Sequence, residues 1–302
     1  MITDLNILDL DATELDAMTP DQMASYAADL WRDGSSKLER GRALSTSGRV
    51  PIVALGDSWF DYQPIGFDIL DFLQRVPEYQ IYDHGEAGDT LENMVYGTDF
   101  KRRTFRPSKP RLEDTLDDLR LSGAKFLLLS GGGNDFAGNE LENLLNHAET
   151  GYSPIRDNHL DYLVETVFRG AFEALFERVW AIDPNIQIIG HGYGNAVPDG
   201  RAVIQIGRFQ WVGPWLRPAF AKKRIVCSCQ AQEIITTLIS RLNGLLQSLE
   251  SQYANYHALD ARTVIEPSDW ENELHLKNSA FRRVAMLFRD KIDELRFSAV
   301  LT

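Results

Sequence analysis

The chain has 302 residues, 44% of them hydrophobic, and its 31 basic and 44 acidic side chains give a net charge of −13. A chain of this length buries enough surface to fold without disulfides or metals, as one large domain or two small ones. The acidic balance excludes a protein whose main partner is nucleic acid, because neutralising phosphates requires a basic face.

The N-terminal segment, residues 1–48, is acidic, with nine acidic and four basic side chains. Within it, Thr19 is a good N-cap, Pro20 follows at the first helical position and Gln22 suits a capping box. We therefore expect an acidic helical extension over 1–48, packed on a main domain over 49–302. A signal peptide would be basic here, and no run reaches the roughly 18 apolar residues of a membrane span.

After this extension, short apolar runs alternate with helical stretches. The runs end in Gly, Asp or Ser, and they predict five strands at 51–55, 79–83, 125–130, 185–190 and 256–260. The stretches between and after them predict helices near 64–76, 111–121, 158–182, 230–252 and 278–295. This alternation indicates parallel strands with right-handed crossovers, covered by helices on both faces. The predicted fold class is a three-layer α/β/α sandwich, and ligands in such folds bind at the carboxyl ends of the strands.

The end of the first predicted strand carries a serine on a sharp turn, in Gly56-Asp57-Ser58-Trp59. Such a turn exposes a hydroxyl group above the sheet, which suits a nucleophile. Phe60 occupies the place of the second glycine of the G-x-S-x-G elbow, so the turn is not that of an α/β-hydrolase. The alternative interpretation is that Asp57 or Ser58 only caps the following helix.

Three further strand ends or loops carry polar groups that could act together with this serine. Residues 84–90 (HGEAGDT) offer a main-chain N–H after a glycine, and 131–135 (GGGND) present an amide and a carboxylate. His275 lies in a polar loop before the last amphipathic helix. A lone histidine is usually structural, but these groups together would supply a nucleophile, two donors and a base.

At these residues the sequence resembles the SGNH (GDSL-type) hydrolases. The resemblance covers about 50–295 through four blocks in chain order, Val53–Trp59, Gly85–Thr90, Gly131–Asp135 and Asn272–His275. Each block is short, and their shared order at the right strand ends carries the resemblance. It implies a parallel, flavodoxin-like sheet and an esterase or lipase that needs no cofactor.

The resemblance also implies roles for four residues, one in each block. Ser58 is the nucleophile and His275 its base, which takes the serine proton and returns it to the leaving group. Gly88 through its main-chain N–H, Asn134 through its side-chain amide and the Ser58 N–H form the oxyanion hole. The bound substrate is expected to be a small-molecule or lipid ester.

One position departs from the family pattern. Asn272 stands where these enzymes commonly have an aspartate, and an amide does not stabilise an imidazolium as a carboxylate does. Asp269, Glu271 or Glu273 could reach Nδ1 of His275, or a main-chain carbonyl, that of Asn272, could fix the tautomer. We favour the carbonyl, which makes the pair a Ser–His dyad. The departure also leaves open an inactive ligand-binding protein on the same fold.

A metal site and a dinucleotide site are not supported. The six histidines show no H-x₃-H or HExxH pattern, so no metal is predicted. The string 190–195 (GHGYGN) follows the fourth predicted strand, but Asn195 stands in place of the third glycine of a dinucleotide motif.

Two basic segments stand out in this acidic chain, 101–111 and 201–224, each with six bases and no acid. The second lies in a predicted insertion at about 196–228, beyond the fourth strand. One interpretation is a mobile wall over the serine that binds an acyl group and attracts an anion. The other is a loop whose aromatic side chains enter the core while its bases pair with the acidic N-terminal segment. The predicted pocket side chains are Trp59, Phe136, Trp211 and Trp215.

Cys227 and Cys229 are two residues apart, too close for an ordinary structural disulfide and too few for a four-ligand metal site. This favours a reducing, cytoplasmic location, although leaderless secretion would leave no mark in the sequence. The predicted function is a serine hydrolase of acyl, acetyl or lipid esters. A thioesterase or phospholipase with the same residues is the alternative enzyme, and the sequence leaves the oligomeric state open.

Overall fold

The computed structural model describes residues 8–23, 48–62, 66–101, 106–202, 204–206 and 209–298. At residues 100, 101, 106, 204–206 and 209–212 it describes the backbone alone.

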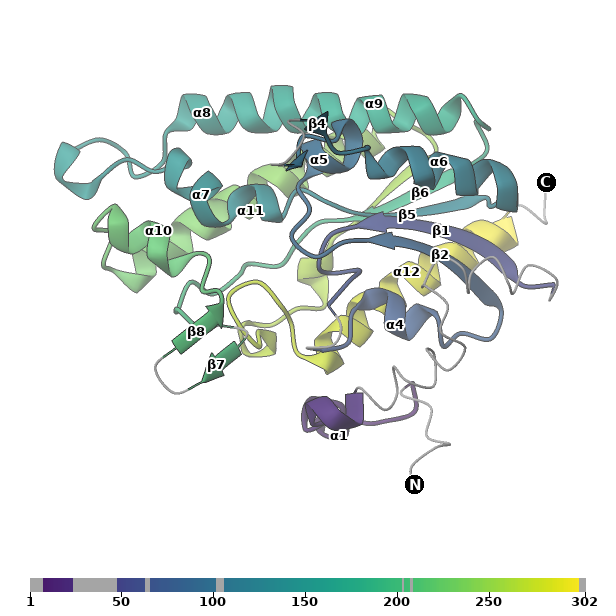
Figure 1. Cartoon of the computed structure of the whole chain (residues 1–302), viewed down its shortest axis with the longest axis horizontal. Coiled ribbons are helices and arrows are strands. Elements are labelled where there is room, and N and C mark those ends of the chain that lie inside the picture. Colours follow the sequence, from purple (N-terminus) through teal and green to yellow (C-terminus); the bar gives the residue numbers. More distant parts are fainter. Residues whose placement is uncertain are drawn as a thin grey trace.

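A five-stranded parallel sheet forms the centre of the molecule (Figure 1). Its strands, in sequence, are β1 (Val50–Gly56), β2 (Tyr79–Gly85), β5 (Phe126–Ser130), β6 (Gln187–His191) and β9 (Tyr256–Leu259). They lie side by side in the order β2-β1-β5-β6-β9, and every neighbouring pair is parallel. In chain order this is the 2-1-3-4-5 arrangement of flavodoxin-like folds. The predicted fold class and all five predicted strands are confirmed.

Helices cover both faces of the sheet (Figure 1). On one face α4 (Ile69–Leu73) packs against α12 (Asn278–Ser298), below the sheet in Figure 1. The opposite side carries the helices of the crossovers that follow β2, β5 and β6: α5 (Leu91–Tyr96), α6 (Arg111–Ser122), α7 (Gly138–Leu144), α8 (Asp157–Tyr162), η3 (Leu163–Phe168), α9 (Arg169–Trp180) and α11 (Ser228–Glu250). The predicted helix over 158–182 is interrupted by the π-helical turn η3.

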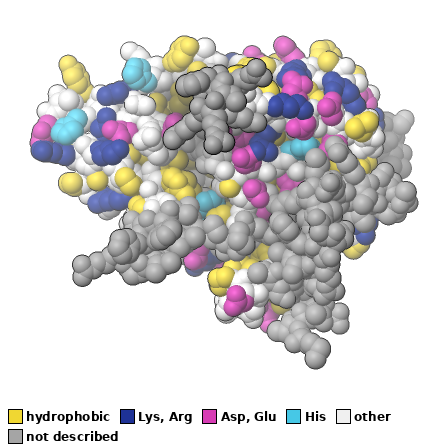
Figure 2. Space-filling model, viewed as in Figure 1, with side chains coloured by type: hydrophobic (Ala, Val, Ile, Leu, Met, Phe, Trp, Pro, Cys, Tyr) yellow, Lys and Arg dark blue, Asp and Glu magenta, His cyan; other side chains and the backbone are white. Residues whose placement is uncertain are grey.

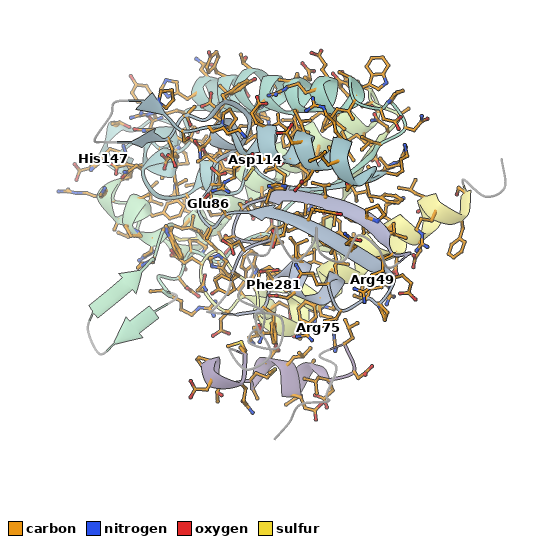
Figure 3. The ribbon with its side chains drawn as sticks, turned by 45° about the vertical axis from the view of Figure 1, so that its right-hand side comes forward. Arg49, Arg75, Glu86, Asp114, His147 and Phe281 are labelled. Atoms are coloured by element: carbon orange, nitrogen blue, oxygen red, sulfur yellow. A yellow bond between two sulfur atoms is a disulfide. The ribbon has the colours of Figure 1, made fainter. Side chains whose placement is uncertain are left out.

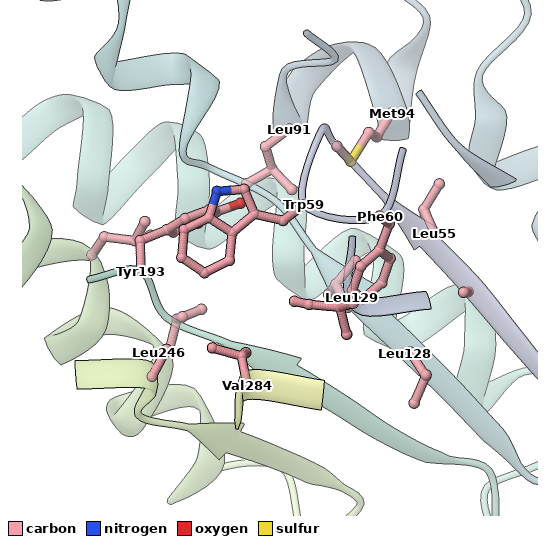
Figure 4. Close-up of a cluster of buried hydrophobic side chains, with 14 of the residues drawn as sticks. Leu55, Trp59, Phe60, Leu91, Met94, Leu128, Leu129, Tyr193, Leu246 and Val284 are labelled. Atoms are coloured by element: carbon pink, nitrogen blue, oxygen red, sulfur yellow. The ribbon is translucent and has the colours of Figure 1, made fainter. Parts of the chain in front are cut away.

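The central strands are buried on both faces because helices cover both. All five residues of β5 are buried, as are the last five of β1. Figure 4 shows Leu55, Leu128 and Leu129 of these strands among side chains from the helices on either side, Met94 and Val284 among them. Continuous apolar runs therefore mark these strands in the sequence, instead of an alternating pattern.

The described part of the N-terminal extension contains a short helix that packs on α12. Helix α1 (Ala12–Asp16) starts at a capping box of Asp11 with Glu14, and Leu15 is fully buried. The Asp16 carboxylate accepts hydrogen bonds from the N–H and hydroxyl of Ser279, at 2.9 and 2.7 Å. Thr19 and Gln22 form the predicted capping box, with Pro20 at the first helical position. The rest of the predicted helix lies outside the described residues, and the domain boundary at 48 stays a prediction.

The insertion after β6 is not a mobile wall throughout. It contains β7 (Ile204–Ile206) and β8 (Phe209–Val212), which pair as a hairpin, and α10 (Arg217–Lys222). Phe220 of α10 is fully buried and Leu216 is 2% exposed, so this part belongs to the core. The prediction of a mobile wall is wrong here because an apolar face of α10 packs inward.

The bases of the insertion pair with acids of the main domain. Lys222 lies 2.6 Å from Glu142, and Arg224 pairs with Glu149. On the face shown in Figure 2, acidic and basic side chains are interspersed. The segregation of charge along the sequence is thus balanced in space by local ion pairs, which contribute little to stability when exposed.

Cys227 and Cys229 form a disulfide, with a Cα–Cα distance of 5.4 Å that lies in the usual range. The prediction that their spacing is too short is wrong. Cys227 is the extended N-cap of α11, and Cys229 is in the first turn of that helix, which brings the two side chains together. The cysteines therefore no longer support the cytoplasmic location, which stays a prediction. Among the described residues, no helix is long and apolar enough to cross a membrane.

Candidate active site

The turn after β1 places Ser58 at the carboxyl edge of the sheet. Gly56 allows the turn, because a Cβ atom there would come within 2.5 Å of the Phe60 ring. The Asp57 carboxylate accepts a hydrogen bond from the main-chain N–H of Trp59 at 3.0 Å and so stabilises the turn. It does not cap the following helix, because α4 begins at Ile69 and has Asp68 as its N-cap. Ser58 is 7% exposed and lines a cavity.

A buried polar network fixes this turn from below. The Asp57 carboxylate accepts hydrogen bonds from the hydroxyl groups of Ser130, at 2.8 Å, and Tyr193. His191 Nε2 lies 2.8 Å from Ser130 Oγ, and its ring stacks on Trp59. Figure 4 shows Tyr193 beside Trp59. The sequence interpretation missed His191 and Tyr193. Their signal was a glycine-rich string at the end of a strand, which was considered only as a dinucleotide motif.

His275 faces Ser58 from the loop before α12. Its Nε2 atom lies 2.9 Å from Ser58 Oγ. The indole N–H of Trp59 donates to the main-chain oxygen of Leu274 at 3.0 Å, which ties the serine turn to the histidine loop. A bridge between Trp270 and Leu276 closes that loop. The structure thus brings together two sequence blocks that are more than 200 residues apart.

The side chain of Asn272 fixes the orientation of the imidazole. Its Oδ1 accepts hydrogen bonds from the main-chain N–H groups of Leu274 and His275, both at 3.0 Å, while its Nδ2 donates to Tyr62 Oη. These partners determine which amide atom is oxygen. Oδ1 also lies 3.1 Å from His275 Nδ1, so Nδ1 must carry the proton and Nε2 is free to accept one from Ser58.

This geometry corrects the expected orienting group. We expected the main-chain carbonyl of Asn272, but its side-chain oxygen faces Nδ1, because the two N–H donors of the turn hold it there. Asp269 pairs with Arg283. Glu273 accepts hydrogen bonds from main-chain N–H groups, that of Trp215 among them, and Glu271 is exposed.

His275 is enclosed by aromatic rings. Tyr62 stacks on the imidazole with ring centres 4.0 Å apart, and Trp215 meets it edge-on at 5.8 Å. Burial lowers the pKa of His275 from 6.5 to about 3, because a charged imidazolium is poorly solvated there. Burial likewise raises the pKa of Tyr62, which keeps its proton. The histidine is therefore a neutral base at ordinary pH.

Two of the candidate oxyanion donors, Ser58 and Asn134, line one cavity. Asn134 Nδ2 donates a hydrogen bond to the main-chain oxygen of Asp89, the neighbour of Gly88, at 2.9 Å. One Nδ2 hydrogen remains for a ligand. Gly88 has φ +84°, a conformation that favours glycine. Within the described part of the chain, the N–H groups of Ser58 and Gly88 have no hydrogen-bond partner.

Charged groups hold the glycine block in place. Asp89 is buried, which raises its pKa to about 6, and its carboxylate lies 3.2 Å from the Arg111 guanidinium. Arg111 also pairs with Glu86, which Figure 3 shows at the edge of the sheet close to α6. Asp135 accepts a hydrogen bond from the N–H of Leu91 at 3.0 Å and so caps α5 from outside. Its burial raises its pKa to about 7.

A small cavity of about 40 Å³ opens beside Ser58. Its lining is mostly apolar and comprises Asp57, Ser58, Trp59, Gly133, Asn134, Tyr193, Gly194, Ala196, Ile239, Trp270 and Leu274. Of the three predicted pocket side chains that the structure describes, only Trp59 lines it. Phe136 is buried against Phe168, because the turn after β5 directs it into the core. Trp215 contacts His275 instead of the cavity, and the side chain of Trp211 lies outside the described residues.

The chemistry available at this site is nucleophilic. Over the described residues, no group of three or more His, Cys, Asp or Glu side chains could hold a metal ion. A hydroxyl group, a base of fixed tautomer and main-chain and amide donors are the groups that acyl transfer requires.

The chain is similar in structure to several esterases and lipases of low sequence identity. A family 3 carbohydrate esterase from Clostridium thermocellum is 13% identical over 83% of this chain and 99% of that one, with a TM-score of 0.45. A carbohydrate acetylesterase family member from Sinorhizobium meliloti is 13% identical over 82% of this chain and 98% of that one, with a TM-score of 0.49. An extracellular lipase from Streptomyces rimosus is 10% identical over 75% of this chain and 86% of that one, with a TM-score of 0.45. No protein-family model and no curated protein matches the chain.

Proposed function

We propose that this protein is a serine hydrolase that cleaves carboxylic esters. The proposal rests on one observation, the unbroken chain of contacts from Ser58 Oγ to His275 Nε2, and from His275 Nδ1 to Asn272 Oδ1. Burial keeps the histidine neutral, and this chain of contacts directs its free lone pair at the serine hydroxyl. That is the protonation state in which a histidine activates a nucleophile.

In the first half of the reaction, Ser58 Oγ attacks the carbonyl carbon of the ester while its proton passes to His275 Nε2. The carbonyl π electrons move to oxygen, and the resulting oxyanion accepts hydrogen bonds from the N–H groups of Ser58 and Gly88 and from Asn134 Nδ2. Collapse of the intermediate breaks the bond to the alcohol oxygen, which takes the proton from Nε2. The products are an acyl-serine and a free alcohol.

In the second half, a water molecule attacks the acyl-serine and gives its proton to His275 Nε2. The second oxyanion uses the same donors. Its collapse breaks the bond to Ser58 Oγ, which recovers the proton, and a carboxylic acid leaves. The two half-reactions need no oxidant, reductant or cofactor.

Asn272 makes the pair a dyad with an uncharged orienting group. Its oxygen fixes the tautomer of His275, as an aspartate does in a triad, but it adds no negative charge to stabilise the imidazolium. The imidazolium formed in the transition state is therefore balanced mainly by the oxyanion itself. This is consistent with the low pKa of the free histidine.

The cavity beside Ser58 favours a short acyl group. A water molecule needs at least about 10–15 Å³ of such space, so a cavity of about 40 Å³ accommodates roughly three waters. An acetyl or propionyl group is of this size, whereas a fatty acyl chain is far larger. We therefore propose acetyl and other short-chain esters as substrates, over lipid esters.

The test is a panel of p-nitrophenyl esters from acetate to palmitate, run with the wild type and Ser58→Ala. The proposal expects turnover that depends on Ser58 and falls as the acyl chain lengthens. A folded wild type that binds short esters without turnover would support the ligand-binding protein instead. Faster cleavage of acetyl thioesters than of matched oxygen esters would favour the thioesterase.

A further inference from the structure

Glu273 lies within the histidine loop, one residue after Asn272, and is fully buried. Its carboxylate contacts a different part of the chain. It accepts hydrogen bonds from four main-chain N–H groups: Oε1 from Gly200 and Arg217, both at 2.9 Å, and Oε2 from Trp215 and Leu216, both at 2.7 Å. We call this arrangement the Glu273 clamp.

The clamp uses the whole hydrogen-bonding capacity of the side chain. A carboxylate offers about four lone-pair sites, and four N–H groups fill them. Burial raises the pKa of Glu273, and the four N–H groups act against this rise. Bonds of N–H groups to a carboxylate are among the stronger ones in proteins. The clamp therefore joins the histidine loop firmly to residues 200 and 215–217, which lie far away in the sequence.

One of the clamped residues touches the candidate base. The Trp215 ring meets the His275 imidazole edge-on, with centres 5.8 Å apart. The ring lies over Gly213, where a Cβ atom would come within 2.7 Å of it. The main-chain oxygen of Trp215 accepts a hydrogen bond from Gly138, four residues after Asn134, at 3.1 Å. Trp215 is thus held at both its N–H and its C=O.

The position of Trp215 indicates which part of a substrate it meets. It does not line the cavity beside Ser58, to which we assign the acyl group. In ester cleavage the leaving oxygen must receive its proton from His275 Nε2, so the alcohol part lies next to the imidazole. A ring that touches the imidazole from outside the acyl cavity borders the space for the alcohol.

We propose that Glu273 is a positioning residue that holds Trp215 beside His275 as the wall for the alcohol part of the ester. This inference rests on the proposed function. The wall is aromatic, so it favours esters whose alcohol presents a flat apolar surface, such as a phenol, over esters of small alkyl alcohols.

The test compares phenyl acetate with methyl acetate, which share an acyl group, in wild type, Glu273→Gln, Trp215→Ala and the double variant. Glu271→Gln is the matched control, because it removes an exposed carboxylate two residues away. We expect each single variant to raise KM for phenyl acetate about two- to tenfold, the range for one aromatic contact, with kcat little changed. Methyl acetate and the control should respond little.

The double variant separates positioning from general support of the fold. If Glu273 acts through Trp215, the double variant raises KM no more than Trp215→Ala does, because the two changes remove one interaction. Additive effects, or an equal loss for both esters, would overturn the proposal. A fall in kcat with a displaced pH profile would also overturn it, since Glu273 would then act on His275.

Two observations keep this test independent of folding and of the proposed function. If Glu273→Gln does not fold, Trp215→Ala alone decides, since an unchanged KM for phenyl acetate contradicts the wall. If the wild type hydrolyses neither ester while a fluorophosphonate fails to label Ser58, the proposed function fails. If the wild type hydrolyses both esters and the variants have the same KM values as the wild type, the proposed function stands and only the role of Glu273 fails.

Discussion

Replacing Asn272 by aspartate converts the proposed dyad into a carboxylate triad with a single change of charge. The site can accept it. Oδ1 keeps its two main-chain donors, and the Tyr62 hydroxyl, which now accepts from Nδ2, can rotate to donate to the new oxygen. Tyr62 keeps its proton because burial raises its pKa.

The size of the effect follows from one distance. A carboxylate oxygen at 3.1 Å from Nδ1 attracts an imidazolium by about 5 kcal/mol at an effective dielectric constant of about 20. This attraction would raise the pKa of His275 by about four units at most, and the cost of burying the new carboxylate charge makes the rise smaller. The pKa of His275 in the wild type is about 3, so protonation of this base should lower kcat/KM only below about pH 4.

In Asn272→Asp the acid limb of kcat/KM should therefore move up by about two to four pH units. The limb moves to higher pH because His275 must be unprotonated to act as a base, and a raised pKa keeps it protonated up to a higher pH. At pH values above the acid limb, kcat/KM of Asn272→Asp should exceed that of the wild type at least about tenfold. This is a small share of the roughly 10⁴-fold that an orienting aspartate supplies in a triad.

The assay is the pH profile of kcat/KM for p-nitrophenyl acetate from pH 3 to 9, in buffers of constant ionic strength. Ser268→Asp, which adds the same charge at an exposed position nearby, is the control and should leave the limb unmoved. If Asn272→Asp and Ser268→Asp give the wild-type limb, Oδ1 of residue 272 is not the partner of Nδ1, and the dyad geometry is wrong.

Asn134→Ala should lower kcat for acetyl esters about 10²–10³-fold with little change in KM, because the donor acts on charge present only in the transition state. A raised KM with unchanged kcat would instead assign Asn134 to ground-state binding. Ile239→Ala enlarges the acyl cavity and should raise kcat/KM for butyrate relative to acetate, whereas an unchanged ratio would place the acyl group elsewhere. Replacing Cys227 and Cys229 by serine opens a loop of only three residues, so urea unfolding should show a loss of at most about 1.6 kcal/mol, with kcat retained. A larger loss would mean that the disulfide supports more than its own turn.

The fold could be predicted because buried parallel strands leave a strong signal. Short apolar runs separated by helices of crossover length admit few arrangements, and right-handed connections select among them. The strand ends then mark where a site is expected, which made Ser58 and Asn134 candidates, and His275 was added from the loop before the last helix. Helices α5 and α7 were missed because they are short and follow the glycine-containing segments 84–90 and 131–135, whose glycines dominate the local pattern.

The rest of the site depends on side-chain contacts that no local pattern encodes. Asn272 resembles a lost aspartate in the sequence, and only its two main-chain donors show that its oxygen is directed at His275. Glu273 looks like an acid available to the histidine, yet its four partners come from an insertion more than 50 residues away. Phe136 was assigned to the pocket by residue type, and packing directs it into the core. Trp215 lies outside the acyl cavity, against His275.

The central claim is that Ser58 forms a covalent acyl intermediate, and the most direct measurement is rapid quenching of the wild type with p-nitrophenyl acetate, followed by peptide mass spectrometry. The account predicts the mass of one acetyl group on the peptide that contains Ser58, formed in the burst phase and absent from Ser58→Ala. Turnover with no acetylated peptide, or acetylation at another residue that persists in Ser58→Ala, would contradict it.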